Sequence, residues 1–335
     1  MKSRLRIGRA VLIFCLGTGI SGLRSGPAGE TTFACDYLGQ EKPGRTPRLF
    51  APGIISTGRE HSAAMFSPDG REIWFARLSP AEIWHMRLEN GHWSEPKPFP
   101  LERSYRYLYP FLSPDGGRLF FTSNRPVRPG DKPINLGTGD IWVIAKNDGN
   151  WAEPVHLGEK INFGSIQSLG SISRKGNLYY AARTGREPRP AMSVYVAEFV
   201  NGSYSVPRRI DELYADTPSL SPFIAPDESY LLFSSFRGGL GASDLFISFR
   251  RPDGRWSPPQ NLGPRINSPA KDEFPYVTPD GKYLFFNSNR ASALNDRVIP
   301  DGPGNIFWVE ASIIEELRPK RPPDGEERSP EEKSK

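Results

Sequence analysis

The chain contains few of the residues that form disulfide frameworks and transition-metal sites. Among its 335 residues are two cysteines and four histidines, and Cys35 is the one cysteine beyond residue 28. A single cysteine makes no internal disulfide. The histidines show no metal-binding spacing such as His-Glu-x-x-His; they are His61, His85, His92 and His156. We therefore expect a fold that is stable without disulfides and holds no transition metal.

An excess of charge of one sign is also missing from most of the chain. The sequence has 43 basic and 38 acidic residues, but five of the basic residues and none of the acidic ones lie in residues 1–28. The remainder is therefore balanced in charge. Nucleic-acid binding requires a clustered basic face, so we expect no nucleic-acid partner.

The N-terminal segment has the pattern of a secretory signal peptide. A basic opening, residues 1–6, leads into the apolar run 10–20 and then into small and helix-breaking residues up to Ala28. The apolar run is too short to span a bilayer as a transmembrane helix. We predict a signal peptide over 1–28, an extension over 29–44, and a periplasmic or secreted protein with no membrane span after cleavage.

The composition favours short strands joined by turns over long helices. The chain has 33 glycines and 34 prolines, and aromatic residues make up 12% of it. Glycine and proline mark turns, whereas aromatic residues are enriched in strands. An all-β fold is therefore expected. The Pro-, Lys- and Glu-rich stretch 319–335 has little to bury and is predicted to be a disordered tail.

A four-residue phrase recurs five times and sets the organisation of the chain. Its copies are Ser67-Pro68-Asp69-Gly70, Ser113-Pro114-Asp115-Gly116, Ser173-Arg174-Lys175-Gly176, Ala225-Pro226-Asp227-Glu228 and Thr278-Pro279-Asp280-Gly281. Successive copies start 46, 60, 52 and 53 residues apart. Proline and Asp-Gly favour a tight reversal between two strands. The spacing suits a propeller blade of four antiparallel strands.

Each copy is followed by the same series of predicted strands. An apolar second strand covers 73–75, 119–121, 178–180, 231–233 and 284–286, and a third strand covers 83–84, 141–143, 194–196, 245–247 and 306–308. Four copies then carry an Asn-Gly or Asp-Gly turn, which is typical of a two-residue hairpin. A fourth strand is predicted to begin at the aromatic residue that follows, which is Trp93, Trp151, Tyr204 or Trp256.

The fifth copy lacks its fourth strand, and the start of the chain supplies a match for it. Residues 47–50 followed by Ile54 match 154–157 followed by Ile161. We predict that 47–50 pairs beside 305–310, because this closes the ring and removes exposed sheet edges. The predicted domain is a single β-propeller over 45–318, ending in a short helix over 311–317.

The repeats resemble those of a known family. Ser-Pro-Asp-Gly, an apolar strand, Ser-Asn-Arg and Asp-Ile-Trp resemble the WD40-like β-propeller (PD40) repeats of TolB-type periplasmic proteins, over about residues 45–318. This resemblance implies a propeller that commonly has six blades. The sequence contains five repeats, so five blades are predicted and six blades remain the alternative.

The chain direction places a candidate ligand site on one face of the ring. The longest insertions, 126–139 and 291–304, and a shorter one, 184–192, are predicted on the face opposite the five hairpins, and lengthened loops on a rigid scaffold commonly bind ligands. Polar residues at the starts of the innermost strands are predicted to line the channel rim on this face. They are Glu60, His61, Arg106, Tyr107, Gln167, Asp272 and Glu273. The alternative is a solvated channel mouth without a ligand.

Other recurring polar residues are interpreted as structural. One arginine closes each second strand: Arg77, Arg125, Arg183, Arg237 and Arg290. Acids or amides open several third strands, at Glu82, Asp140, Asp244 and Asn305. Charge-assisted pairs between the two sets would fix each loop base, and repetition in every blade is what a shared framework requires.

The sequence favours binding over catalysis. No nucleophile elbow or other catalytic motif is present. We predict a scaffold that binds a protein or an envelope glycan through its insertion-bearing face, and a monomer without a cofactor. A glycoside hydrolase using Glu60, Asp272 and Glu273, and a purely structural envelope module, remain alternatives. Acidic residues in the inserts offer oxygen ligands for calcium, although no regular calcium loop is present; they are Asp131, Asp140, Asp296 and Asp301.

Overall fold

The structure is a computed structural model that describes residues 33–62, 64–128, 130–134, 139–164, 166–183, 191–292 and 304–320. The predicted signal peptide, most of the predicted tail and much of the three insertions lie outside these residues. Within the described part, no helix is long and apolar enough to cross a membrane.

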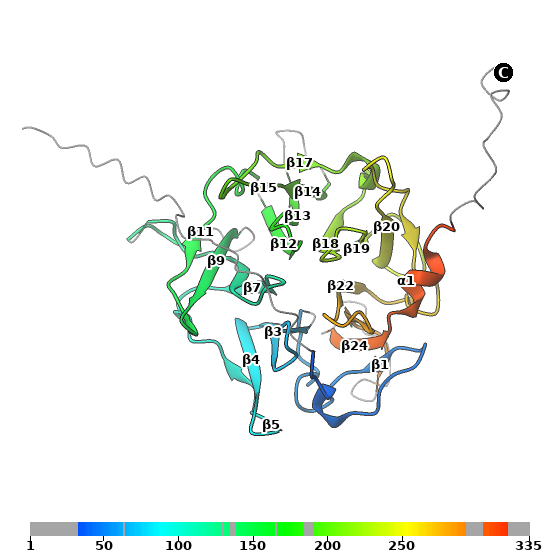
Figure 1. Ribbon diagram of the computed structural model, residues 1–335, viewed down its shortest axis with the longest axis horizontal. Helices are drawn as coiled ribbons and strands as arrows, with labels where there is room; N and C mark the ends of the chain where they lie inside the picture. Colours follow the sequence, from blue (N-terminus) through cyan, green and yellow to red (C-terminus); the bar gives the residue numbers. More distant parts are fainter. Residues whose placement is uncertain are drawn as a thin grey trace, which may run out of the picture.

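Five antiparallel sheets surround a central axis, and each is built from four main strands (Figure 1). Blade 1 contains β2 (Met65–Phe66), β3 (Glu72–Leu78), β4 (Ala81–Glu89), β5 (His92–Trp93) and β6 (Lys97–Pro98). Blade 2 contains β7 (Tyr107–Leu112), β8 (Arg118–Ser123), β9 (Asp140–Asn147), β10 (Asn150–Trp151) and β11 (Val155–His156). Blade 3 contains β12 (Ile166–Ile172), β13 (Leu178–Arg183), β14 (Ser193–Ala197), β15 (Phe199–Val200), β16 (Ser203–Tyr204) and β17 (Arg208–Arg209).

Blades 4 and 5 complete the ring, which confirms the prediction of five blades. Blade 4 contains β18 (Ser219–Ile224), β19 (Tyr230–Ser235), β20 (Asp244–Phe249) and β21 (Gln260–Asn261). Blade 5 contains β22 (Asp272–Val277), β23 (Tyr283–Ser288), β24 (Asn305–Glu310) and β1 (Arg48–Leu49). The remaining elements are the short helices η1 (Tyr37–Gly39), η2 (Asp211–Leu213) and α1 (Ser312–Leu317).

The N-terminal strand closes the ring as predicted. β1 pairs antiparallel with β24, so that Arg48 lies opposite Trp308 and Leu49 opposite Phe307 (Figure 1). The buried residue that follows this strand is Ile55, whereas Ile54, which the repeat pattern matched, is 43% exposed. The turn after Phe50 is one residue longer than its counterparts, and this shifts the apolar position by one.

The segment before β1 reinforces the junction between blades 5 and 1. Tyr37 is buried, and its ring centre lies 4.9 Å from that of Tyr283 in blade 5 and 5.5 Å from that of Phe66 in blade 1. The Tyr37 hydroxyl donates to the Asp280 carboxylate at 3.3 Å. The extension therefore packs across the place where the first and last blades meet.

The fourth strand of each blade differs from its predicted form. The aromatic residues Trp93, Trp151 and Tyr204 lie in short hairpin ends that extend the third strand or, in blade 3, form the small β15–β16 pair. The outermost pairing begins again after the following proline, at β6, β11 and β17. Proline has no backbone N–H to donate, so it divides the outer strand into two short pieces.

The hairpin of blade 4 shows how the repeat tolerates departures from its pattern. Glu228 stands where other copies have glycine, and it adopts the same left-handed backbone with a φ of 64°. Its buried carboxylate accepts hydrogen bonds from Asn177 at 2.7 Å and from Lys175 at 3.2 Å, both in blade 3. Lys175 occupies the position of the usual hairpin aspartate. Glu228 therefore supplies the acid that the neighbouring hairpin lacks.

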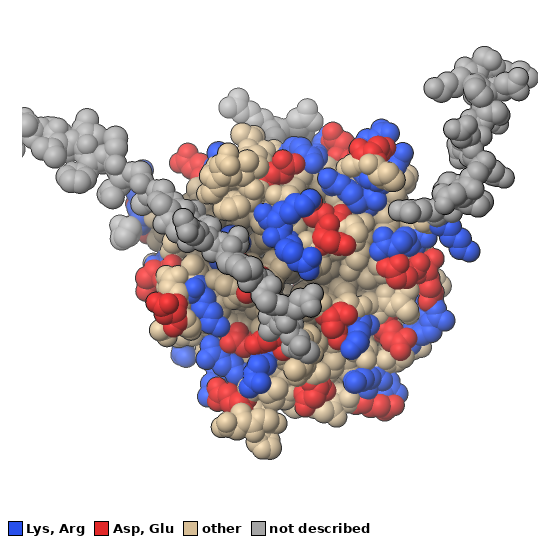
Figure 2. All heavy atoms as spheres, in the orientation of Figure 1, with Lys and Arg blue, Asp and Glu red and all other residues tan. Residues whose placement is uncertain are grey.

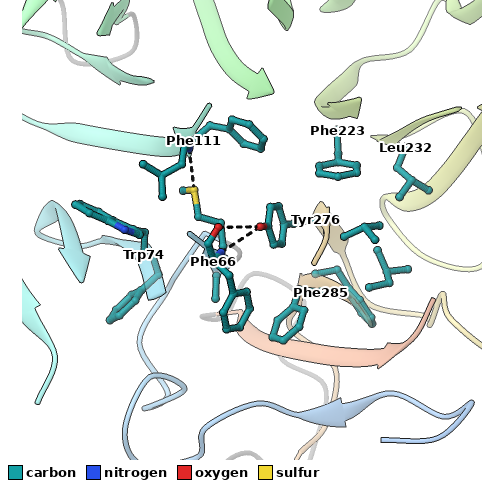
Figure 3. Packing of buried hydrophobic residues seen from close by; sticks show 14 of the residues in the cluster. Phe66, Trp74, Phe111, Phe223, Leu232, Tyr276 and Phe285 are labelled. Atoms are coloured by element: carbon teal, nitrogen blue, oxygen red, sulfur yellow. Dashed lines mark hydrogen bonds between the residues drawn. The ribbon is translucent and has the colours of Figure 1, made fainter. Parts of the chain in front are cut away.

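Aromatic side chains from three blades close the central channel. The ring centres of Phe111, Phe223 and Tyr276 lie 5.5 to 6.4 Å from one another (Figure 3). The Tyr276 hydroxyl also donates to the Phe66 carbonyl at 3.2 Å, which joins blade 5 to blade 1. Because these three rings fill the middle of the ring, the opening on the insertion-bearing face is blind.

Candidate functional site

Backbone bulges in the innermost strands shape the mouth of the channel. Tyr109, Ser221 and Phe274 have φ values of 51°, 49° and 55°, and the strand register shifts at each of them. A proline follows each one. A β-bulge bends its strand and redirects the side chain at that position. Non-glycine residues in this backbone region carry strain, which is often stored at functional sites.

Two of the bulged residues form an aromatic pair. The ring centres of Tyr109 in blade 2 and Phe274 in blade 5 lie 5.3 Å apart with an interplanar angle of 24°. A cavity of about 50 Å³ is lined by this pair and by the channel-closing rings of Phe111, Phe223 and Tyr276. At about 10–15 Å³ for each water, this cavity has room for a few water molecules. The mouth is therefore a shallow aromatic site.

Charged residues frame the aromatic pair. Burial raises the pKa of Tyr109 to about 12, and the nearby Glu273 and Glu60 carboxylates raise it further while Arg106 opposes them. Burial also raises the pKa of the Glu273 carboxyl, which accepts a hydrogen bond from the Ser243 hydroxyl at 2.9 Å. Three of the predicted rim residues, Glu60, Arg106 and Glu273, are thus brought together around Tyr109.

His61, Tyr107 and Asp272, also predicted at the rim, occupy a different side of the innermost strands. Five residues share one register position in the five blades, because each pairs with the residue four positions after the first apolar residue of the second strand. They are His61, Tyr107, Gln167, Ser219 and Asp272. Side chains alternate between the two faces of a strand. This register position therefore faces away from Glu60, Arg106 and Glu273, and His61, Tyr107 and Asp272 are buried.

Asp272 is held within the framework of blade 5. Its carboxylate is fully buried and lies 2.6 Å from an Arg290 guanidinium nitrogen. The other carboxylate oxygen accepts hydrogen bonds from the backbone N–H and the hydroxyl of Ser268, at 2.7 and 2.9 Å. The structure thus gives this carboxylate protein partners on both oxygens, and it does not bring Asp272 to the channel mouth.

The repeated arginines have a shared structural position, with partners that differ from those expected. In blade 4, Arg237 donates to the Ser219 hydroxyl at 3.1 Å and to the Leu213 carbonyl at 2.7 Å. Asp140 lies 2.9 Å from His156, and Asp244 accepts from Asn261 at 2.8 Å. Arg237 and Arg290 thus bond toward the innermost strand, whereas in blade 1 Glu82 lies opposite Arg77 and its charge acts on that arginine.

Buried His61 predicts an acid-sensitive stability. Burial and the neighbouring Arg77 lower the pKa of His61 to about 4, whereas an unfolded histidine titrates near 6.5. Only the unfolded chain takes up this proton between those values, so stability is full above about pH 6.5 and is lost as the pH falls toward 4. The expected loss is about 2 kcal/mol by pH 5, at about 1.4 kcal/mol for each pH unit.

Urea unfolding at pH 7 and pH 5 measures this loss. The matched variant is His61→Gln, because the residue that occupies this register position in blade 3 is a glutamine, Gln167. We expect the variant to lose about 2 kcal/mol less than the natural chain between the two pH values. Equal losses in both proteins would contradict a buried neutral His61.

The part of the chain that the structure describes contains no cluster of metal-ligating side chains. Among those residues there is no group of three or more histidine, cysteine, aspartate or glutamate side chains that could hold an ion. Two of the aspartates considered for calcium, Asp296 and Asp301, lie outside the described residues. On the face seen in Figure 2, acidic and basic side chains are interspersed, and no large patch of one sign is visible.

Sequence reasoning missed the aromatic pair. It placed consecutive polar residues at the rim without allowing for the bulges that bring Tyr109 and Phe274 to the mouth. A signal was present, because proline inside a predicted strand indicates a bulge or an edge. That signal occurs at Pro110, Pro222 and Pro275, in the innermost strands of three blades.

Comparison with known proteins places the chain by its fold. No family model and no curated protein matches it. Among solved structures it is similar to a protein assigned as TolB from Agrobacterium tumefaciens, with 16% identity over 77% of this chain and 92% of that one, at a TM-score of 0.47. TolB from Acinetobacter baumannii matches at 15% identity over 77% of this chain, with a TM-score of 0.47, and this chain covers 59% of its length.

A further similar structure is regucalcin, a calcium-binding protein from Agrobacterium tumefaciens. The identity is 15%, over 79% of this chain and 92% of that one, with a TM-score of 0.43. Likeness at this level concerns the fold and carries over no ligand. The chain is a five-bladed β-propeller closed by its N-terminal strand.

Proposed function

We propose that this protein is an extracytoplasmic scaffold that binds a protein or an envelope glycan at the channel mouth of its insertion-bearing face. The observation that carries the proposal is the Tyr109–Phe274 pair framed by Glu60, Arg106 and Glu273. Aromatic rings supply contact area at low entropic cost, and a few polar groups placed around them fix the orientation of a ligand.

Several features of the mouth support binding there. The aromatic triad makes the opening blind, so a ligand meets a floor and does not pass through the ring. Acidic and basic groups both lie at the mouth, and this suits a polar ligand that presents donors and acceptors or both charges. The positive φ of Tyr109 and of Phe274 is a strain that the surrounding sheet maintains.

A binding comparison between two charge-matched variants tests the proposal. The site variant carries Glu60→Gln, Arg106→Gln and Glu273→Gln. The control variant carries Glu89→Gln, Glu153→Gln and Arg255→Gln, which are exposed and lie near the hairpin-side edges of the blades. Both remove two acids and one base. Each protein is applied to an array of envelope glycans and used for affinity capture from envelope extracts.

We expect the ligand found with the natural chain to bind the site variant at least about tenfold more weakly, which is a loss of about 1.4 kcal/mol. The control variant is expected to bind as the natural chain does. Unchanged binding by the site variant would refute the channel mouth as the site. Hydrolysis of an array glycan, abolished by Glu273→Gln alone, would instead support the glycosidase alternative, in which carboxylates act as acid and base.

A further inference from the structure

A second cavity lies between blades 1 and 2, apart from the channel mouth. It has a volume of about 510 Å³ and is lined by the start of β4, by the chain after β6 and by Tyr107 of β7. Its walls include Ile83, Pro98 and Phe99. Small-molecule sites commonly have volumes of about 300–1,000 Å³ with mainly apolar walls. This cavity is therefore large enough for a small organic ligand.

The corresponding space is filled at two other junctions between blades. After blade 2, Asn162 accepts a hydrogen bond from the Ile141 N–H at 2.7 Å, and after blade 4, Asn267 accepts one from the Leu245 N–H at 2.8 Å. Ile83 occupies the equivalent position in blade 1. Within the described residues no side chain bonds to Ile83 in this way. The cavity lies at this junction, beside Ile83.

Arg125 differs from its counterparts in its surroundings. In blades 4 and 5 the equivalent arginines, Arg237 and Arg290, donate to a carbonyl of the chain that joins the preceding blade, at 2.7 and 2.6 Å. Among the described residues, Arg125 makes no such bond and no ion pair. Its guanidinium carbon lies 5.9 Å from the ring centre of Tyr105, a residue of the cavity wall. The positive charge of Arg125 therefore lies next to a wall residue of the cavity.

Tyr107 contributes a buried hydrogen-bond donor. Its side chain is 2% exposed, and its hydroxyl has no hydrogen-bond acceptor among the described residues. Burial raises the pKa of Tyr107 to about 12, with Arg125 opposing the shift, so the hydroxyl keeps its proton at neutral pH. A buried donor without an acceptor costs about 1–3 kcal/mol. An acceptor brought by a ligand would remove that cost.

The acidic residues of the wall do not cancel the charge of Arg125. Glu82 lies opposite Arg77 in the β3–β4 ladder, and its charge acts on that arginine. Glu102 and Arg103 are neighbours of opposite sign, and both are exposed. The Glu102 charge acts on Tyr107, whereas Arg125 opposes it there. With Arg125 close to Tyr105 and the Tyr107 hydroxyl in a wall that is partly apolar, the cavity suits an anionic group on an apolar body.

We propose that this cavity binds a carboxylate carried on an apolar, preferably aromatic, body. Arg125 and the Tyr107 hydroxyl hold the carboxylate, while Phe99, Ile83 and Pro98 contact the body. Such a carboxylate belongs either to a free small acid or to the C-terminal residue of a peptide. The site does not depend on the proposed function of the channel mouth.

Titration of the full chain with matched small probes tests the proposal by calorimetry or by ligand-observed NMR. The first pair is 3-phenylpropionate and 3-phenylpropionamide, which differ in charge and have nearly the same shape. The second pair is N-acetylphenylalanine and its amide, which mimic a peptide C-terminus. We expect each acid to bind at least about tenfold more tightly than its amide, because a hydrogen bond to a charged group contributes about 1.5–3 kcal/mol. The tighter acid of the two identifies the source of the carboxylate.

Two tyrosine variants provide the matched comparison. Tyr107→Phe removes only the hydroxyl and is expected to weaken acid binding about tenfold without lowering the stability of the ligand-free protein, because the lost donor had no acceptor there. Tyr204→Phe removes another buried hydroxyl that has no partner, in blade 3 and away from the cavity, and is expected to leave acid binding unchanged. Absence of saturable binding by both acids, equal binding of acid and amide, or equal effects of the two variants would each overturn the proposal.

Discussion

Replacing Asp272 with asparagine is expected to lower the free energy of unfolding by about 3–5 kcal/mol, which is the usual cost of leaving one member of a buried ion pair alone. Asp272 is fully buried 2.6 Å from Arg290, and that arginine also donates to the Ile266 carbonyl at the end of blade 4. The substitution keeps the shape of the side chain and removes its charge. Denaturant unfolding at pH 7 measures the loss.

Two further variants separate the ion pair from other causes. Asp272→Asn combined with Arg290→Gln removes both charges and is expected to destabilise less than Asp272→Asn alone. Glu273→Gln changes the next residue, whose carboxyl pKa is already raised by burial, and is expected to alter stability little. A double variant as unstable as the sum of its single variants would contradict the pairing. Of the two adjacent acids, Asp272 is thus expected to stabilise the fold, whereas Glu273 belongs to the proposed binding site.

The fold could be predicted from the sequence because the signal repeats and each copy has a local cause. Proline and Asp-Gly favour a tight hairpin wherever they occur, and an apolar run after each hairpin needs a buried sheet position. The closing strand was also predictable, because residues 47–50 match the outermost strands of other blades. The prolines that divide those strands were visible, but their effect on pairing depends on which N–H groups face the neighbouring strand.

The arrangement of the candidate site was predictable only in part. Alignment by hairpins grouped Glu60, Arg106 and Glu273, whose charges act on Tyr109 or on one another, but it added residues from the opposite face of the same strands. Which face a residue occupies depends on register and on bulges, and one shifted residue reverses the assignment. No local preference favours positive φ at Tyr109 or Phe274, so tertiary contacts set it.

The cavity between blades 1 and 2 was harder to foresee, because what marks its junction in the sequence is a missing side chain. The repeat supplies Asn162 and Asn267 at two junctions, and the chain after Phe99 has no counterpart. An absence becomes informative only once the register shows what normally fills the position.

Replacing Phe50 with alanine is expected to lower the free energy of unfolding by about 3–5 kcal/mol and to make the protein self-associate. Phe50 is fully buried, its ring centre lies 4.9 Å from that of Phe285, and its N–H donates to the Ile306 carbonyl at 2.8 Å. Loss of a buried phenylalanine side chain accounts for the energy. Detachment of β1 would uncover the apolar edge of β24, and an unpaired strand edge is a template for pairing with another chain.

The control is Leu262→Ala, at the equivalent position after the outermost strand of blade 4. Leu262 is also buried, and its backbone N–H donates to the Leu245 carbonyl at 3.0 Å. Loss of its side chain is expected to lower the free energy of unfolding by about 2–5 kcal/mol. The chain on both sides of β21 is held by neighbouring blades, whereas β1 comes from the N-terminal part of the chain and can open locally. Sedimentation velocity should therefore show dimers or larger species for Phe50→Ala alone. Monomers in both variants would contradict the prediction that β1 opens and exposes the β24 edge.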